Sequence, residues 1–231
     1  MFNLHHPLNL EVIGAEAQHD NMQSAAYRVI WGFLRKCPAS KVRFCIFDPK
    51  EGGGSVRMLS NFVNKMPDSY KRAVTQMSRT EELLSCLKEL EGQTLDFIRD
   101  RPDYDDLLDY NAHNPRRTEA ITLLMLYDFP LNADARCLEL LSSVMQKGNR
   151  CGIYVVLCRN TAVEVASSYD HIDEKLAELE KNCVQIECKE NGFALLPYHL
   201  SVRLIEKPDA GQLKKFAVEY HKAVEKLSVQ S

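Results

Sequence analysis

One acidic residue closes the most apolar stretch of the sequence. Residues 121–128 read ITLLMLYD, a short run of Ile, Leu and Met that ends in Asp128. Such a run predicts a strand buried on both faces, as in a parallel sheet covered by helices. An acid at the carboxyl end of a buried strand lies where open α/β sheets bind ligands, and there it can help to hold Mg²⁺. A core strand whose final aspartate only caps the next turn explains the same pattern, so this acid alone leaves the chemistry open.

A second candidate site follows the first apolar segment of the chain. A phosphate-binding P-loop has the form G-x-x-x-x-G-K-[ST], in which the lysine contacts the β- and γ-phosphates and the hydroxyl binds Mg²⁺. The frame that begins at Gly14 reads GAEAQHDN. It has His19, Asp20 and Asn21 where the motif requires glycine, lysine and Ser or Thr. Alone this frame indicates little, because any glycine can begin one.

Alternating strands and helices must position both candidate sites. Apolar runs bounded by turn signals predict strands at residues 8–13, 41–47, 73–77, 121–127, 153–158, 183–189 and 193–196. Apolar residues at helical spacing predict helices at residues 21–35, 104–110, 133–150, 175–181 and 209–226, and a further helix that starts at the N-cap signature of residues 78–82 and runs to 99. Asn191 and Gly192 predict a hairpin between the last two strands. The order of elements predicts an α/β fold with a mostly parallel central sheet flanked by helices.

The composition disfavours several classes of protein. The chain has 231 residues, 45% of them hydrophobic and 26% charged, with a formal net charge of -3. This charge provides no overall basic field for nucleic acid or an anionic membrane. No apolar stretch reaches the roughly 18–20 residues that a membrane span requires. The 8 cysteines are scattered without a CxxC pair, and no histidine has metal-ligand spacing, so we expect neither a disulfide framework nor a metal site. We expect a reduced, cytoplasmic protein, with no membrane contact within this segment.

In their order and spacing, these segments resemble the FtsK/SpoIIIE family of hexameric DNA-translocating ATPases, which includes the type VII secretion ATPases. The first strand, Gly14, Ala15 and the following helix resemble the family's IAG-A-T-G-S-G-K-S segment. Residues 42–50 (VRFCIFDPK) resemble its second strand ending in IDPK, which is the most specific match. Residues 146–160 (QKGNRCGIYVVLCRN) resemble its K-x-R-A-A-G-I-H-L-V-L-A-T-Q-R helix and strand. The resemblance covers residues 5–200 and implies a P-loop NTPase core of the RecA/FtsK type.

The same resemblance implies where a nucleotide would bind. It assigns to a degenerate nucleotide site the positions Gly14, Ala15, His19, Asp20, Asn21, Asp48, Lys50 and Asp128. Asp128 corresponds to the residual Walker B acid, in a YDF segment that resembles the family's IDE. The resemblance also implies that the strands at 8–13 and 121–127 are neighbours in the sheet.

Departures from the family's pattern predict that this site does not work as an ATPase. Asp20 and Glu16 place acids in the phosphate-binding loop. Two unit charges about 4 Å apart interact by about 4 kcal/mol at an effective dielectric constant of about 20, so exchanging attraction for repulsion abolishes ordinary ATP affinity. Phe129 stands where the catalytic glutamate should be, and a phenyl ring cannot activate water. Residues 158–160 (CRN) replace the polar A-T-Q that senses the γ-phosphate.

These departures favour one function over two alternatives. We expect a single degenerate domain, residues 1–231, excised from a longer multi-domain protein, with a structural or regulatory role in a DNA translocase of the chromosome-segregation type. Its partners are then neighbouring ATPase modules of the parent chain or copies of itself, and no cofactor is expected. The first alternative is an active translocase that binds ATP, Mg²⁺ and DNA as an oligomer, with Lys50 and Asp128 as its surviving site. The second is a protein-substrate-binding module of a type VII secretion ATPase.

Three arginines are candidates for contacts outside the nucleotide site. Arg116 and Arg117 could touch a phosphate backbone, although paired basic residues on a loop are usually only solvated. Arg150 matches an arginine of the family pattern, and the resemblance implies a reach from there toward a neighbouring subunit. Because the domain is net acidic, we expect the isolated chain to bind DNA only weakly.

Overall fold

An eight-stranded sheet runs through the centre of the molecule, in the order β3-β2-β4-β5-β1-β6-β7-β8. The computed structural model describes residues 9–36, 41–50, 74–163, 172–190 and 192–203, and helical residues 211, 212, 215, 218 and 219. Neighbouring strands from β3 to β6 are all parallel, and β7 and β8 are added antiparallel. The predicted α/β fold with a mostly parallel sheet is confirmed.

The strands lie close to their predicted positions. Their bounds are β1 (Asn9–Gly14), β2 (Val42–Phe47), β3 (Val74–Met77), β4 (Ile121–Phe129), β5 (Ile153–Asn160), β6 (Cys183–Lys189), β7 (Gly192–Leu195) and β8 (Leu200–Val202). β6 and β7 form the predicted antiparallel hairpin. β8 was not predicted, because its three residues are too short to show a periodic pattern.

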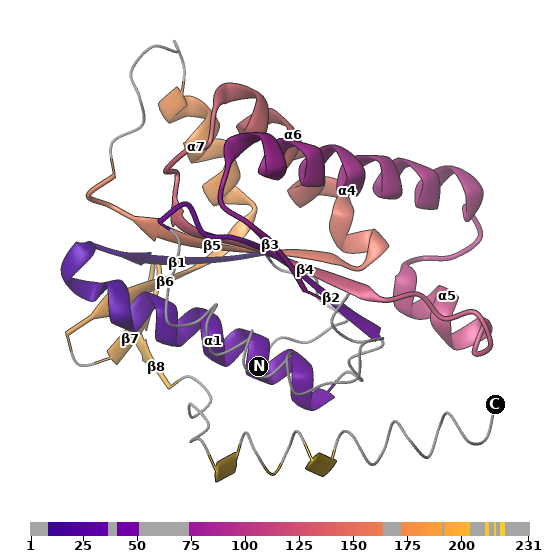
Figure 1. Ribbon diagram of the computed structural model, residues 1–231, viewed down its shortest axis with the longest axis horizontal. Coiled ribbons are helices and arrows are strands. Elements are labelled where there is room, and N and C mark those ends of the chain that lie inside the picture. The colour runs from indigo at the N-terminus through magenta and orange to yellow at the C-terminus, as the bar shows by residue number, and fades with distance from the viewer. Residues whose placement is uncertain are drawn as a thin grey trace.

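Helices cover both faces of this sheet (Figure 1). α1 (His19–Lys36) lies on one face, and α4 (Thr80–Asp100), α6 (Ala135–Lys147) and α7 (Ile172–Lys181) lie on the other. α5 (Leu107–His113) precedes β4 at the edge where the parallel strands begin. Most of the helix predicted at 209–226 lies outside the described residues. No described helix combines the length and apolar character needed to cross a membrane.

The expected adjacency of the first strand and the organising strand is wrong. β1 and β4 are parallel members of one sheet, but β5 lies between them and pairs with both. The chain passes from β4 through α6 directly to β5, and a short right-handed crossover of this kind places the two strands side by side. The carboxyl ends of β1, β5 and β4 therefore meet at one edge of the sheet.

Two helix boundaries also differ from the prediction, and each has a local cause. The helix predicted at 104–110 begins at Leu107, because the side chain of Asp106 accepts a hydrogen bond from the Asp109 amide at 2.8 Å and caps it. The helix predicted at 133–150 ends at Lys147 and continues as the 3-10 helix η3 (Gly148–Cys151). Gly152 then turns the chain into β5 with φ 73, a conformation that favours glycine.

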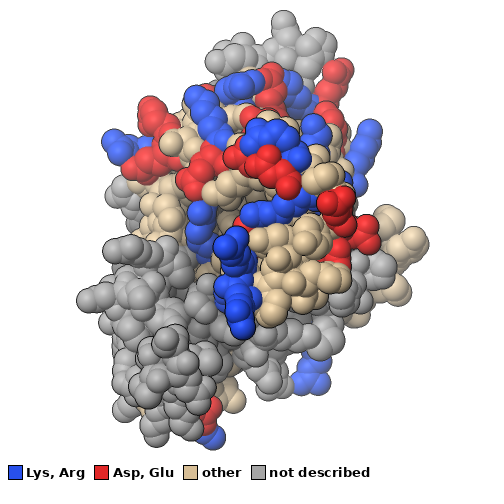
Figure 2. All heavy atoms as spheres, turned by 90° about the vertical axis from the view of Figure 1, so that its right-hand side faces the viewer, with Lys and Arg blue, Asp and Glu red and all other residues tan. Residues whose placement is uncertain are grey.

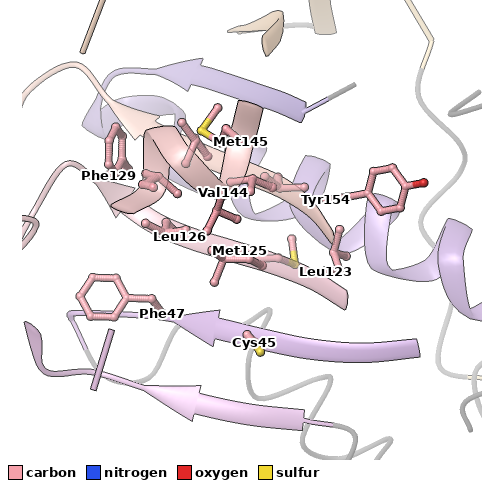
Figure 3. Packing of buried hydrophobic residues seen from close by; sticks show 14 of the residues in the cluster. Cys45, Phe47, Leu123, Met125, Leu126, Phe129, Val144, Met145 and Tyr154 are labelled. Carbon is pink, nitrogen blue, oxygen red and sulfur yellow. The ribbon is translucent and has the colours of Figure 1, made fainter. Parts of the chain in front are cut away.

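β4 forms the centre of the core. All nine of its residues are buried. Figure 3 shows Leu123, Met125 and Leu126 of β4 among side chains of neighbouring elements, including Phe47 of β2 and Val144 of α6. The helix face that covers β4 comes from α6, whose buried residues are Cys137, Leu138, Leu140, Leu141, Val144 and Met145. This packing fixes the end of β4, and with it the acid that follows the apolar run.

Candidate functional site

Asp128 lies at the carboxyl edge of the sheet, near the end of β4. Its side chain is 1% exposed, and its backbone has φ 49. A positive φ is uncommon outside glycine and is tolerated best by Asn and Asp. The Asp128 carbonyl accepts a hydrogen bond from the Leu131 amide at 2.9 Å, which closes the turn after the strand. The strand end therefore holds a buried carboxylate in a fixed direction.

A lysine from the neighbouring strand end neutralises this carboxylate. Lys50 follows β2, and its Nζ lies 3.1 Å from Asp128 Oδ1. The same Nζ lies 3.4 Å from each carboxylate oxygen of Glu16, in the 3-10 helix η1 (Glu16–Gln18) that follows β1. One ammonium group thus bridges two acids from different elements.

Two further side chains complete this group. Asn160, the last residue of β5, donates hydrogen bonds from Nδ2 to Asp128 Oδ1 at 3.1 Å and to Glu16 Oε2 at 2.6 Å. His19 Nδ1 lies 3.6 Å from Asp128 Oδ1, and His19 Nε2 lies 2.8 Å from Gln23 Nε2. We call Lys50, Asp128, Glu16, Asn160 and His19 the Lys50–Asp128 cluster. It joins the carboxyl ends of β1, β2, β4 and β5.

The electrostatics of this cluster keep its lysine and its exposed acid charged. The pKa of Glu16 is lowered, first by the hydrogen bond from Asn160 and then by the hydrogen bond and charge of Lys50. Burial would lower the pKa of Lys50, but the hydrogen bond and charge of Asp128, followed by those of Glu16, outweigh burial and raise it. The contact between the Lys50 ammonium and the Glu16 carboxylate is therefore an ion pair at neutral pH.

The loop after β1 uses its own polar groups internally. In a phosphate-binding loop, successive backbone N–H groups point at the ligand. Here the Ala15 amide donates to Gln18 Oε1 at 3.0 Å, and the Gln18 amide donates to the Ala15 carbonyl at 2.8 Å. Gly14 is closely surrounded, because a Cβ at this position would lie 3.0 Å from Met22 Sδ. The loop thus forms a compact 3-10 turn over the end of β1.

The remaining residues of the predicted nucleotide site are spread around the cluster. Asp48 accepts a hydrogen bond from the Lys50 amide at 3.3 Å, which shapes the turn that presents Lys50. Asn21 donates from Nδ2 to the Lys189 carbonyl at 3.1 Å, so it binds the end of β6 rather than the cluster. Asp20 is exposed at the start of α1. Of the predicted site residues, the structure brings His19, Lys50 and Asp128 into direct contact.

Sequence reasoning missed the bridging role of Asn160 and the position of Glu16. In the sequence Asn160 belongs only to the segment that replaces A-T-Q, and nothing in the sequence shows that β5 lies beside β1, where Asn160 reaches the loop after β1. The contact of Glu16 with Lys50 depends on the compact turn of η1, which the P-loop frame did not predict.

A second buried acid lies on β1, outside the predicted site. Glu11 is 1% exposed, and burial raises its pKa despite a hydrogen bond from Gln185 and the charge of Arg159. Gln185 Nε2 donates to Glu11 Oε2 at 2.8 Å, and Arg159 Nη1 lies 3.5 Å from Glu11 Oε1. Arg159 also pairs with Glu180 of α7. These contacts tie α7 to the centre of the sheet.

The three candidate arginines lie away from the Lys50–Asp128 cluster. Arg116 and Arg117 are exposed in the loop before β4, and so lie at the amino edge of the sheet, opposite Asp128. Arg150 donates from Nε to the Asp105 carbonyl at 2.9 Å and from Nη2 to the Tyr104 carbonyl at 2.8 Å. Figure 2 shows the side of the molecule on which α5 lies. On this face acidic and basic side chains are interleaved.

Comparison with known proteins relates this fold to secretion and conjugation ATPases. No protein-family model matches the sequence, and no curated protein is similar to it at a significant level. Among solved structures, EssC (ATPases 2 and 3) from Geobacillus thermodenitrificans matches 95% of this chain and 44% of its own, with 10% identity and a TM-score of 0.61. The cytoplasmic domain of the Thermomonospora curvata type VII secretion ATPase EccC matches 78% of this chain and 20% of its own, with 17% identity and a TM-score of 0.54.

A third similar structure is the pCW3 conjugation coupling protein TcpA, as a monomer with ATPγS. It matches 81% of this chain and 50% of its own, with 12% identity and a TM-score of 0.55. This chain therefore spans half or less of the length of each of these three solved chains. At these identities the similarity concerns the fold alone, and it agrees with the mostly parallel α/β core that the sequence predicted.

Proposed function

We propose that this domain keeps an ATPase fold without ATP turnover and serves as a structural or regulatory part of a multi-domain translocase. The observation that carries the proposal is the 3.1 Å contact between Lys50 Nζ and Asp128 Oδ1 at the carboxyl edge of the sheet. In nucleotide-hydrolysing relatives of the fold, the corresponding acid helps to hold Mg²⁺. Here an ammonium group of the chain itself neutralises that acid.

Binding of Mg²⁺ and ATP would have to dismantle the Lys50–Asp128 cluster. Mg²⁺ requires near-octahedral coordination and gives up its water reluctantly, so it would have to displace both Lys50 and Asn160 from Asp128. The phosphates would meet Glu16 and Asp20 instead of a P-loop lysine. Phe129 is 2% exposed and packs in the core, where it offers no group that could activate water. Each of these features supports a non-hydrolysing role.

The proposed context is an assembly of ATPase modules in the cytoplasm. The solved EssC and EccC chains each contain ATPases 2 and 3, and this chain spans 44% and 41% of their lengths. We propose that this domain likewise packs beside neighbouring modules of a longer chain, or beside copies of itself. In that arrangement a rigid, nucleotide-free domain would brace an active neighbour.

The second candidate function is a protein-substrate-binding module of a type VII secretion ATPase. It is favoured by a solved EccC (ATPases 2 and 3) in complex with a signal sequence peptide, which matches 93% of this chain with 15% identity and a TM-score of 0.54. The mixed charge of the amino-edge face, with Arg116 and Arg117 as its exposed loop arginines, gives less support to a DNA-gripping role.

Phosphate release tests the first proposal directly. The chain is incubated with ATP and Mg²⁺ over a range of protein concentrations, with and without duplex DNA, beside an Asp128→Asn variant. We expect phosphate release at background in every condition, because Phe129 stands where the catalytic glutamate would be and Lys50 holds the Asp128 carboxylate that would bind Mg²⁺. Turnover that DNA stimulates, and that Asp128→Asn abolishes, would overturn the proposal in favour of an active translocase.

DNA binding and peptide binding separate the alternatives. The isolated domain is expected to bind a labelled duplex no better than about 10⁻⁴ M at physiological salt, the weak end of nonspecific binding. Low-micromolar binding that is lost when both Arg116 and Arg117 become Glu would contradict this. A signal-sequence peptide that binds the same domain saturably would favour the secretion module.

A further inference from the structure

The loops on the two sides of α5 carry charges of opposite sign. Asp103 and Asp105 lie in the loop before the helix, and Arg116 and Arg117 lie in the loop after it. All four residues are exposed. The edge of the sheet at which the parallel strands begin therefore carries an acidic pair and a basic pair, with α5 between them.

Ion pairs form elsewhere around α5, but not at these four positions. Arg101 pairs with Glu119, and His113 Nδ1 lies 3.1 Å from Asp109 Oδ1. Within the described part of the chain, none of the four exposed side chains forms an ion pair. Their charges are therefore not compensated by a described residue of the same molecule.

Hydrogen bonds hold both loops in place. Arg150 donates to the carbonyls of Tyr104 at 2.8 Å and Asp105 at 2.9 Å. The Arg117 amide donates to the Asn114 carbonyl at 2.9 Å, and Asn114 Nδ2 lies 3.1 Å from the Tyr104 hydroxyl, which joins the two loops. A surface that is ordered in advance loses less conformational entropy when it binds a partner.

A groove beside the first loop fits a protein surface better than a nucleic acid or a small anion. The groove has a volume of about 620 Å³, and its charged lining residues are Asp105 and Asp106 before α5, and Lys147 and Arg150 at the end of α6 and in η3. Acids and bases are equal in number there, so the lining does not favour a polyanion by charge. A partner that carries both signs of charge is complementary to it.

The chain itself has a complementary surface. α5 has 7 residues and is therefore about 10 Å long. If two copies lie with their α5 helices antiparallel, the start of each helix is opposite the end of the other. Each arginine pair then faces the acidic pair of the other copy, and a twofold axis makes this contact occur twice. A parallel arrangement would instead bring like charges together, which is unfavourable.

We propose that α5 and its two flanking loops form a self-association surface, on which a second copy of this chain binds with its α5 antiparallel. Arg116 and Arg117 of each copy contact Asp103 and Asp105 of the other. Because exposed ion pairs are individually weak, the dimer is transient and depends on all of these contacts together. The surface lies at the opposite edge of the sheet from the Lys50–Asp128 cluster, so the inference does not depend on the proposed loss of ATP turnover.

Sedimentation velocity of the full chain, without nucleotide, tests the proposal. At about 0.02 M salt the sedimentation coefficient should rise with protein concentration toward that of a dimer, and at about 0.5 M salt it should stay at the monomer value, because salt screens exposed charges. A chain that stays monomeric at the lower salt concentration, up to its solubility limit, would overturn the proposal.

Charge reversal provides two complementary variants. One combines Arg116→Glu with Arg117→Glu, and the other combines Asp103→Lys with Asp105→Lys. Each variant alone should be monomeric at the lower salt concentration, because like charges then face each other in both halves of the interface. An equimolar mixture of the two should associate again, because one copy then presents only acids at these positions and the other only bases.

A matched control separates this contact from an effect of net charge. The combination of Arg136→Glu on α6 with Lys175→Glu on α7 changes the net charge by the same amount as the arginine variant, and it should associate like the wild-type chain. Loss of association in this control would overturn the proposal. A mixture of the two charge-reversed variants that stays monomeric, although both retain the wild-type circular dichroism spectrum, would also overturn it.

Discussion

At the scale of single residues, the molecule pairs a buried carboxylate with a lysine from the end of another strand. Asp128 is almost completely buried, so its charge must be compensated inside the protein. Lys50 and Asn160 provide that compensation, and neither residue belongs to the element that carries Asp128. These three side chains therefore link the ends of β2, β4 and β5.

Replacing Lys50 should lower the free energy of unfolding, because the buried Asp128 carboxylate then loses its cationic partner. Lys50→Met leaves Asp128 with Asn160 as its main partner, and we expect a loss of about 1–3 kcal/mol in the free energy of unfolding, reduced from a fully buried pair because Lys50 is 40% exposed. Adding Asp128→Asn should recover part of this loss. Urea denaturation of the two single variants and the double variant measures the coupling. Strictly additive effects would mean that the two side chains are energetically independent.

Glu82 determines how α4 begins. Its carboxylate accepts hydrogen bonds from the Ser78 amide at 3.0 Å and the Arg79 amide at 3.2 Å, and pairs with the Arg79 side chain. These bonds, the first of them foremost, lower the pKa of Glu82 to about 2. Because the folded pKa lies below the unfolded one, this stabilisation is complete above the ordinary glutamate pKa of 4.5 and is lost as the pH falls toward 2.

This linkage gives a pH-dependent prediction. Glu82→Gln should lower the free energy of unfolding at pH 7 and should have little effect near pH 2, as measured by urea denaturation at both pH values. Glu81→Gln, in the same helical turn, is the control and should have little effect at either pH. Equal losses for both variants at pH 7 would assign the effect to the general charge of the first turn rather than to the cap.

At the scale of elements, glycine positions distinguish a required turn from a tolerated one. Gly152 joins η3 to β5 with φ 73, and a Cβ there would lie 2.2 Å from Leu107 Cδ2. Gly92 lies inside α4, and a Cβ there would meet nothing within 4 Å. The same substitution should therefore have opposite effects at the two sites.

We predict that alanine at these two positions changes the free energy of unfolding in opposite directions. Gly152→Ala should lower the free energy of unfolding by about 2–4 kcal/mol, because it combines left-handed backbone strain with a clash against Leu107. Gly92→Ala should raise it by about 0.5–1 kcal/mol, because alanine favours a helix interior. Thermal or urea unfolding of both variants decides the matter. A stabilised Gly152→Ala variant would contradict the described turn.

Helices and strands were predicted well where the apolar pattern was strong. They were predicted poorly where capping determined a helix boundary or chain topology determined the strand order. The apolar run at 121–128 predicted β4, because a strand that is buried on both faces is apolar at nearly every position. The start of α5 depended on which aspartate caps it, a choice that several nearby acids left open. The place of β5 between β1 and β4 is a property of chain crossovers, and local sequence does not encode it.

At the scale of the whole molecule, the similarity to solved ATPases and the chemistry of the site support different conclusions. The fold matches EssC over 95% of this chain, whereas identity is only 10%. The sequence could predict which positions depart from the nucleotide-binding pattern, namely Asp20, Asn21 and Phe129. It placed Lys50 and Asp128 in one site, but it could not predict that Glu16 and Asn160 would join them, because that contact brings together residues from four separate segments.

The central claim is that this contact prevents nucleotide binding, and isothermal titration with ATP and Mg²⁺ tests it most directly. The wild-type domain is titrated beside the control variant Lys175→Ala, which removes the ion pair between Lys175 of α7 and Glu139 of α6. We predict no binding in the micromolar range for the wild-type domain or the control. A dissociation constant below about 10 µM for the wild-type domain, equivalent to roughly 7 kcal/mol, would contradict the account.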